Sequence, residues 1–257
     1  MVSIIMPCFN SEKYIASAIE SVIVQTYTDW ELLITDDCST DNTISIVDKY
    51  IQADRRIKLF QTSRNSGHPS EPRNISLNNA LGEYLAFLDS DDMWLPGKLE
   101  EQIAFIKLNK CLLVSSYSEF VDSDGKSLGI ISRFKKVAGY RDMLKGYQLS
   151  SPTIFCSASL KPILYFPELP KEDYIAWLKV LQTGVLIYNT QTVNAYYRVH
   201  DSSRSRNKCS MLMEQWRILR RVAALNMVVS FYYICIYIWC SLKKYYGGKL
   251  CNTNLGI

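Results

Sequence analysis

The chain has 257 residues, of which 48% are hydrophobic, and carries a formal net charge of +4. This length and apolar content fit one large domain, or one domain with an appendage, and exclude a disordered or fibrous protein. The charge is modest and the sequence has no zinc-finger spacing, no single-strand-binding aromatic motif and no long basic tract, so we expect no nucleic-acid partner.

Strand and helix patterns alternate through the first part of the chain. The strand patterns lie at 2–6, 31–35, 57–60 and 84–88, and the helix patterns at about 14–23, 44–51, 73–81 and after Pro96. Pro7 is expected to end the first strand. Strands separated by short helices are typical of a parallel sheet built from right-handed crossovers. We therefore predict an α/β fold, with a mostly parallel central sheet and helices on both faces.

The pattern changes after residue 116. Apolar runs at 111–116 and 128–132 flank the sequence Asp-Ser-Asp-Gly at 122–125, which is a hairpin-type turn signal. A helix is predicted at about 172–183 and a strand at 185–188. The second half therefore reads as a mixed-sheet extension of the first.

The most informative feature is the strand pattern at 84–88, because Asp89, Asp91 and Asp92 follow it directly. Ligands of open α/β sheets sit beyond the carboxyl ends of the strands, where these acids lie. Magnesium and manganese are held there by one or two carboxylates together with substrate phosphates. The alternative for the acids alone is a solvated turn that caps the next helix.

Two other strand ends converge on the same edge, at 7–10 and at 36–37. Phe9 can supply a face on which a base stacks, and Asp37 can accept hydrogen bonds from a base or a ribose. The sequence has neither GxGxxG nor GxxxxGK[ST], so it indicates neither a hydride-transfer cofactor nor a P-loop. A metal ion and Arg73 are left to bind the phosphates. The convergence predicts a nucleotide-diphosphate pocket.

Together these motifs resemble the inverting family 2 glycosyltransferases of GT-A fold, of the bacterial surface-polysaccharide or O-antigen type. The resemblance rests on 2–10, 36–43, 72–74 and 82–92, and covers roughly residues 2–205. It implies a nucleotide-sugar donor and a divalent cation, manganese or magnesium, as cofactor. The donor-binding residues that it implies are Pro7, Phe9, Asn10, Asp36, Asp37, Arg73, Asp89 and Ser90. Asp91 is implied as the first metal ligand, with Asp89, while the choice among Asp89, Asp91 and Asp92 stays open.

Glu172 and Asp173 are similar to the acidic pair on the acceptor side of that family, which implies that Asp173 is the catalytic base. Inverting transfer needs a carboxylate that deprotonates the acceptor hydroxyl as it attacks. The alternative is that both are first-turn acids favoured by the helix dipole. The segment 197–200 resembles the one that closes over the diphosphate, where His200 is a candidate metal ligand and equally well a structural histidine.

The resemblance implies a hexosyltransferase-type enzyme that adds one sugar from a UDP-type donor to a lipid-linked saccharide. A metal-dependent nucleotidyltransferase and an inactive sugar-nucleotide-binding protein remain as alternatives. Residues 1–205 are expected to form the catalytic domain, with a nucleotide-binding half at 1–116 and an acceptor half at 117–205. Residues 206–257 form a basic and hydrophobic C-terminal extension.

Residues 222–242 are almost uncharged and long enough to cross a bilayer. Polar positions recur along them as one narrow stripe, and basic pairs flank both ends, which predicts a helix that lies along a membrane surface. The stripe consists of Asn226, Ser230, Tyr233, Tyr237 and Ser241. A spanning helix and a buried core helix are the alternatives.

The eight cysteines show no paired spacing, which is typical of reduced thiols, and no signal peptide is visible. We therefore expect a protein on the cytoplasmic face of the inner (plasma) membrane, peripheral or monotopic.

Overall fold

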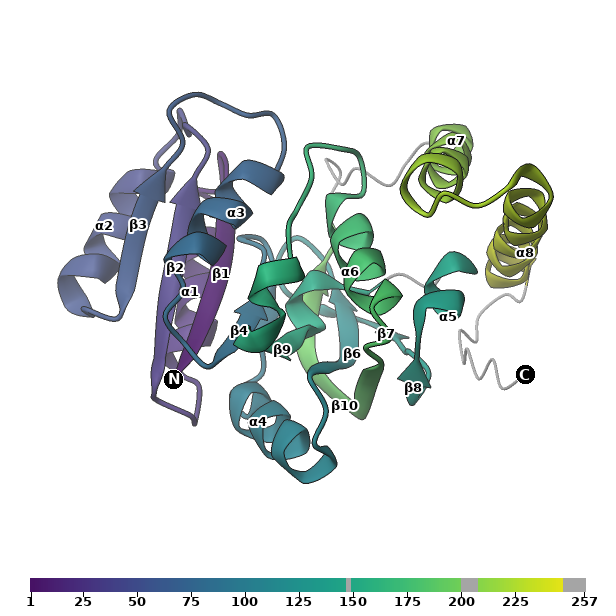
Figure 1. Ribbon diagram of the computed structural model, residues 1–257. Helices are drawn as coiled ribbons and strands as arrows, with labels where there is room; N and C mark the ends of the chain where they lie inside the picture. Colours follow the sequence, from purple (N-terminus) through teal and green to yellow (C-terminus); the bar gives the residue numbers. More distant parts are fainter. Residues whose placement is uncertain (147–148, 200–207, 247–257) are drawn as a thin grey trace.

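The computed structural model describes residues 1–146, 149–199 and 208–246. Its strands are β1 (Val2–Cys8), β2 (Trp30–Asp36), β3 (Ile57–Gln61), β4 (Tyr84–Phe87), β5 (Met93–Trp94), β6 (Leu113–Val121), β7 (Ser127–Ser132), β8 (Val137–Ala138), β9 (Phe155–Ser157) and β10 (Ile187–Arg198). Its α-helices are α1 (Ile15–Ile23), α2 (Thr43–Ala53), α3 (Ser70–Asn79), α4 (Lys98–Asn109), α5 (Tyr140–Leu144), α6 (Glu172–Gln182), α7 (Lys208–Arg217) and α8 (Met227–Tyr246). Figure 1 shows their arrangement.

One sheet runs through the protein in the order β3-β2-β1-β4-β9-β6-β10-β5, with β7 added to β6 and β8 to β10. The first four strands of this order are parallel to one another, as are β6 and β10. The strands β5, β7, β8 and β9 pair antiparallel. The predicted α/β fold, with its central mostly parallel sheet, is confirmed.

Alternate residues of the central strands face two separate cores. Ile4 and Leu32 point to one face, which is covered by α1, α2 and α4, and Ile5 and Leu33 point to the other, which is covered by α3, α5 and α6. All four side chains are fully buried. The predicted placement of helices on both faces is therefore confirmed, and it explains why these strands are apolar throughout.

The first strand does not end at Pro7 as predicted, because β1 continues to Cys8. Pairing of β1 with β4 ends at Ile5 and Phe87, whereas pairing with β2 continues through Pro7 to Cys8. Beyond Ile5 the strand thus pairs on one side only, where the missing N–H of a proline breaks no ladder hydrogen bond.

The start of β4 is fixed because the backbone before it, at Gly82, packs closely against β1. Gly82 lies so close to β1 that a Cβ atom there would come within 2.6 Å of the Ser3 backbone nitrogen. The Ser3 hydroxyl accepts a hydrogen bond from the Gly82 N–H and donates one to Glu31, which also accepts from the Leu81 N–H. This network sets the register of β4, and hence the position of the acids that follow it.

The hairpin predicted at 122–125 joins β6 and β7, with Gly125 at a φ of +83°. The last strand is longer than predicted, because it continues from 188 to Arg198. Its middle part is irregular: the register with β6 shifts between Asn189 and Ala195, and Gln191 has a φ of +64°. Pairing with β6 on both sides of this bulge joins the two parts into one strand.

The C-terminal extension packs beside α5 and α6 as α7, a short π-helical turn at Ile218–Val222, and α8 (Figure 1). Within the described part of the chain, no helix is both long and apolar enough to span a membrane. Two residues of the polar stripe, Ser230 and Tyr233, are buried on α8, whereas Asn226, just before the helix, is exposed; Val228, Phe231 and Trp239 on the other face are 80%, 64% and 68% exposed. The side chain of Ser241 lies outside the described residues.

Candidate active site

The carboxyl ends of β1, β2 and β4 meet at one edge of the sheet, as the sequence predicts. Hydrogen bonds tie the segments that follow them together. Ser11, after β1, shares a hydrogen bond of 2.8 Å with Ser90, after β4, and its backbone N–H donates to Thr43 beyond β2. Three segments far apart in the sequence therefore form one surface.

The residues expected to bind the donor differ in their access to solvent. Phe9 and Asn10 are exposed, and the Phe9 ring is free to stack on a base at 47% exposure. Pro7 and Asp36 are buried, and Asp36 accepts hydrogen bonds from the Ser39 N–H and the Cys8 thiol. Asp36 is fully buried and its carboxylate holds the loop after β2; direct binding of the donor by Asp36 stays a prediction.

Asn10 and Cys38 both have positive φ angles, of 46° and 59°. Asn10 adopts this conformation because its Oδ1 accepts a hydrogen bond from the Thr40 N–H and its own N–H donates to Ser39. Residues in the left-handed region are uncommon outside glycine and collect at functional sites. The strain is thus compensated by a cross-link between the loops after β1 and β2.

Asp37 is buried, and its carboxylate accepts hydrogen bonds from the Thr62 hydroxyl and from the N–H and hydroxyl of Ser66. These bonds attach the loop after β3 to the end of β2. The hydrogen-bonding capacity of the carboxylate is largely used within the protein, which makes Asp37 an anchor for this loop.

The three acids in the turn after β4 differ in their exposure to solvent. Asp92 is 2% exposed, and its Oδ1 accepts a hydrogen bond of 2.8 Å from the Arg198 N–H. Burial, with repulsion from Asp91 and Asp89, raises the pKa of Asp92. Asp89 and Asp91 remain partly exposed. Asp92 is therefore structural, and only Asp89 and Asp91 present carboxylates that a metal ion could reach.

Arg198 fixes this turn from β10. Its Nε donates to the Asp91 carbonyl and its Nη1 to the Ser123 carbonyl, each at 2.8 Å, and its guanidinium lies over the Tyr14 ring. Arg198 lies within the segment 197–200 that the sequence singles out, but only His200 of that segment is predicted to have a role. The role of Arg198 depends on β10 reaching the edge of the sheet.

Arg73 connects the donor edge to the second half of the protein. The side chain is 5% exposed and its guanidinium donates to Asp89 at 2.5 Å and to Glu172 at 2.6 Å. Burial alone lowers the pKa of Arg73, but the two carboxylates outweigh it and raise the pKa. Glu172 and Asp173 begin α6, so Arg73 holds the start of this helix against the strand-end acids.

Asp173 lies beside this ion-pair network at the first turn of α6. Burial and the charge of Glu172 raise the pKa of Asp173 to about 6, although Arg73 and the Tyr174 N–H act in the opposite direction. A carboxylate with such a pKa is ionised at neutral pH and is more basic than an ordinary Asp. The arrangement can therefore accept a proton from a hydroxyl group close to the donor edge.

In the described residues there is no group of three or more His, Cys, Asp and Glu side chains placed to hold a metal ion. His200 lies outside these residues. Asp89 and Asp91 still fit the usual magnesium or manganese site of nucleotide enzymes, in which one or two carboxylates act with substrate phosphates. The site would thus be completed by the ligand rather than by the protein alone.

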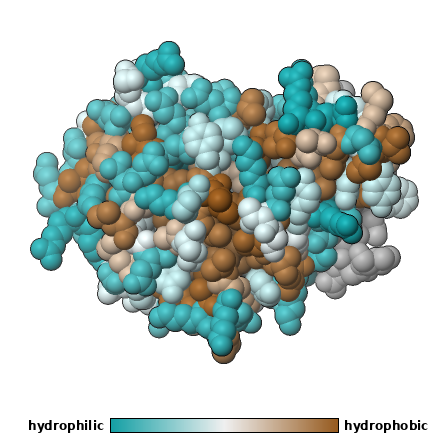
Figure 2. All heavy atoms as spheres, in the orientation of Figure 1, coloured by the Kyte–Doolittle hydropathy of each residue, from teal (hydrophilic) through white to brown (hydrophobic). Residues whose placement is uncertain are grey.

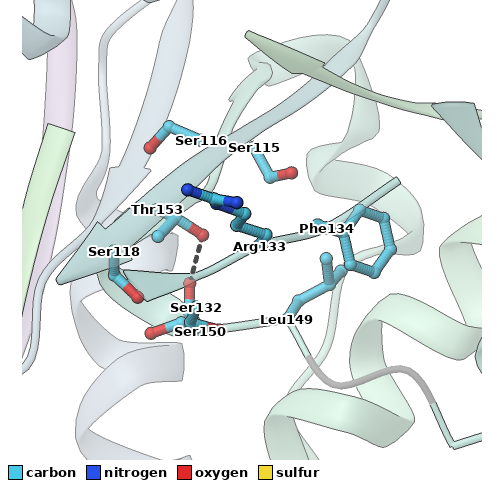
Figure 3. Close-up of a pocket in the computed structure, with 9 residues that line it drawn as sticks. All are labelled: Ser115, Ser116, Ser118, Ser132, Arg133, Phe134, Leu149, Ser150 and Thr153. Atoms are coloured by element: carbon cyan, nitrogen blue, oxygen red, sulfur yellow. Dashed lines mark hydrogen bonds between the residues drawn. The ribbon is translucent and has the colours of Figure 1, made fainter. Parts of the chain in front are cut away.

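A separate small cavity lies between β6, the end of β7 and the segment 149–153 (Figure 3). Its volume of about 20 Å³ has room for about one water molecule. The hydroxyls of Ser116 and Ser150 lack protein partners there, and Figure 3 shows the Arg133 guanidinium extending between Ser116 and Thr153. The cavity suits a buried water and is too small for a substrate.

The fold and the site together resemble those of enzymes that bind a nucleotide diphosphate at the carboxyl edge of an α/β sheet, with Asp173 beside that edge as a candidate base. The chain belongs to glycosyltransferase family 2, whose sequence model matches residues 3–164. Enzymes of this family generally use divalent cations. The family assignment supersedes the nucleotidyltransferase alternative and confirms the predicted resemblance.

Two relatives extend over almost the whole chain. An Escherichia coli protein, the UDP-Glc:alpha-D-GlcNAc-diphosphoundecaprenol beta-1,3-glucosyltransferase WfgD, is 35% identical over 249 residues, which are 95% of each chain. The putative teichuronic acid biosynthesis glycosyltransferase TuaG of Bacillus subtilis is 31% identical over 245 residues, which are 95% of this chain and 97% of that protein.

Solved structures of glycosyltransferases have the same fold as this chain. TarS 1-349 of Staphylococcus aureus, in complex with UDP-GlcNAc, superposes with a TM-score of 0.71 at 26% identity, covering 98% of this chain and 74% of that one. The mannosyltransferase PcManGT of Pyrobaculum calidifontis, in complex with GDP-Man and Mn2+, superposes with a TM-score of 0.65 at 15% identity, covering 97% of this chain and 76% of that one. At this low identity the likeness shows the fold alone. The predicted GT-A fold is confirmed.

Removal of Arg73 should destabilise the protein strongly, because it leaves the buried Glu172 carboxylate without its partner. We expect Arg73→Met to lower the free energy of unfolding in urea by about 3 kcal/mol. Adding Glu172→Gln in the same chain should recover at least about 1 kcal/mol, since the uncompensated charge is gone.

Lys135→Met is the matched control for this experiment, because its ion pair with Asp142 is more exposed, and it should cost less than about 1 kcal/mol. Equal losses for Arg73→Met and Lys135→Met, or no recovery in the double variant, would contradict a structural role for the Arg73 bridge.

Proposed function

We propose that this glycosyltransferase transfers one sugar from a UDP-sugar to a lipid-linked saccharide, with inversion, during surface polysaccharide assembly. The observation that carries the proposal is the Asp173 carboxylate, whose raised pKa suits a base and whose helix is held at the donor edge by Arg73. The donor and acceptor classes are those named for WfgD, which matches this chain over 95% of its length.

The donor would lie on the surface made by the loops after β1, β2 and β4. Phe9 would stack on the base. Asn10 and Asp37 would hold the loops around the donor through their hydrogen bonds to Thr40 and Ser66. Asp36 and Ser90 would support these loops from the protein interior. Arg73, buried between two acids, would act on the phosphates by positioning Asp89. Residues 1–205 would form the catalytic domain; position 116, the proposed boundary of its two halves, falls within β6.

Asp91 and Asp89 would hold a manganese or magnesium ion, and His200 remains a candidate third ligand. Such an ion stabilises the negative charge of a departing diphosphate. The protein's own contribution is the rigid turn that presents the two carboxylates, fixed by Arg198 and by the buried Asp92.

The reaction would be a single displacement. The Asp173 carboxylate would take the proton of the acceptor hydroxyl while its oxygen attacks the anomeric carbon, and the bond from that carbon to the UDP oxygen would break. Lys171 and Glu172 flank the base, and the helix N-terminus favours its ionised form.

Asp91→Ala should abolish transfer and leave the melting temperature within about 2 °C, because a partly exposed acid leaves no core cavity. Isothermal titration should show loss of Mn²⁺-dependent UDP binding, and a chelator should stop the wild-type enzyme. Asp124→Ala, in the exposed β6–β7 turn, is the control and should turn over normally. Full activity of Asp91→Ala, or of the chelated enzyme, would refute the metal assignment.

Asp173→Asn should retain UDP-sugar affinity and lower kcat by about a hundredfold or more, the usual scale for loss of a positioned base. Wild-type kcat should fall as the pH falls through about 6, because protonation removes the base. The exposed Asp48→Asn on α2 is the control. Equal losses of affinity and turnover, or a product of retained anomeric configuration, would argue against this role.

We further propose that the exposed apolar face of α8 attaches the enzyme to the cytoplasmic face of the inner membrane, as a peripheral or monotopic protein. Met227, Val228 and Trp239 are more than half exposed, and contiguous exposed apolar residues mark interaction sites. Because the polar stripe packs on the protein, the apolar side of the helix is the one turned outward.

Trp239→Asp should weaken sedimentation with anionic phospholipid vesicles by about tenfold or more, since a charge replaces a large apolar side chain. Leu108→Asp on α4 is the control, because Leu108 is even more exposed than Trp239, at 82% against 68%, but lies on another helix. Unchanged vesicle binding by Trp239→Asp would exclude this face as the attachment surface.

A further inference from the structure

A groove runs between α7 and α8. It has a volume of about 420 Å³, within the usual range of about 300–1,000 Å³ for small-molecule sites. Its lining consists of Leu212, Met213, Trp216, Arg217, Phe231 and Ile234. Figure 2 shows hydrophobic side chains gathered over these two helices at the upper right. The groove is therefore an apolar slot with a single charged side chain.

The groove lies next to the catalytic helix. Gln215, which precedes Trp216, is buried, accepts a hydrogen bond from Lys171 and donates one to the Tyr174 hydroxyl. Lys171 and Tyr174 are immediate neighbours of Glu172 and Asp173. Gln215 thus ties α7, which forms one wall of the groove, to the start of the helix that carries the proposed base.

A second contact between α8 and the catalytic region comes from Tyr237. The Lys171 ammonium lies over its ring, and a Cβ on Gly146 would meet the ring at 2.3 Å. Tyr237 therefore packs directly against the backbone of the segment after α5. These contacts fix α8, and with it one wall of the groove, relative to the start of α6.

We propose that this groove binds the hydrocarbon chain of the acceptor, a long-chain isoprenoid diphosphate that carries the sugar. The inference rests on the proposed function, since it specifies the acceptor for that same site. Arg217 at the rim provides charge complementarity to the diphosphate, which follows directly after the chain in such a lipid. The sugar beyond the diphosphate would then reach Asp173.

The chemistry of the lining favours a hydrocarbon over a peptide. A bound peptide must satisfy its backbone N–H and C=O groups, whereas five of the six lining residues are Leu, Met, Trp, Phe or Ile. A concave slot also suits a single chain better than a bilayer surface, which would contact outward residues such as Val228 and Trp239 instead.

The test uses the full-length enzyme and two soluble acceptors, the ethyl and dodecyl esters of GlcNAc diphosphate, below the micelle concentration and without vesicles. Each buried methylene contributes a factor of about four in affinity, so the dodecyl ester should have a KM at least about tenfold lower. Phe231→Asp and Met213→Asp should reduce this ratio to near one while leaving kcat/KM for the ethyl ester unchanged.

Tyr232→Asp is the matched control, because Tyr232 neighbours Phe231, is similarly exposed and does not line the groove; it should keep the wild-type ratio. Equal KM values for the two esters in the wild type, or a ratio retained in Phe231→Asp, would overturn the groove assignment alone. Failure of the wild type to transfer sugar to either ester would overturn the proposed function as well.

Discussion

The buried guanidinium of Arg73 is the interaction on which the site depends. It forms ion pairs with Asp89, at the end of β4, and with Glu172, at the start of α6. The two acids are 83 residues apart, and each would be costly to leave charged beside the other without a cation. The arginine therefore fixes the distance between the strand-end acids and the helix that carries Asp173, the proposed base, and so joins the two halves.

The aspartates at the carboxyl edge of the sheet differ in burial, and more of them are present than the one or two that usually bind a metal ion. Asp36, Asp37 and Asp92 are buried and accept hydrogen bonds from neighbouring loops or from Arg198, so they build the surface. Asp89 and Asp91 remain partly exposed, and these are the two proposed to bind a metal ion. Burial thus distinguishes identical side chains, because a buried carboxylate must find its hydrogen bonds within the protein.

The C-terminal helices give the protein an apolar surface at one end, next to the acceptor side of the catalytic region. Two polar side chains of α8, Ser230 and Tyr233, are buried against the body of the protein. The outward side chains are apolar, and α7 closes a groove with them. An enzyme whose acceptor carries a lipid gains from such a surface, since the lipid can be held while the sugar reaches the base.

Local patterns were sufficient to predict the parallel strands, the helices between them, the acids after β4 and the pair at 172–173. The period and composition of each segment indicate which of its residues are buried, and several motifs in the same order and spacing indicate a site that no single motif would. The sequence also determined that Phe9, Asp91 and Asp173 lie at strand or helix ends, where ligands meet an α/β sheet.

Only the tertiary structure decided which acids are accessible, that Arg73 bridges two of them, and that Arg198 fixes the turn. These facts depend on pairings between residues 16 to 107 positions apart, and no local pattern contains them. The orientation of α8 was decided in the same way. A polar stripe can face water or another part of the protein, and here the Tyr233 ring of the stripe is buried in the core that α5 and α6 also line, because burying an aromatic ring is favourable.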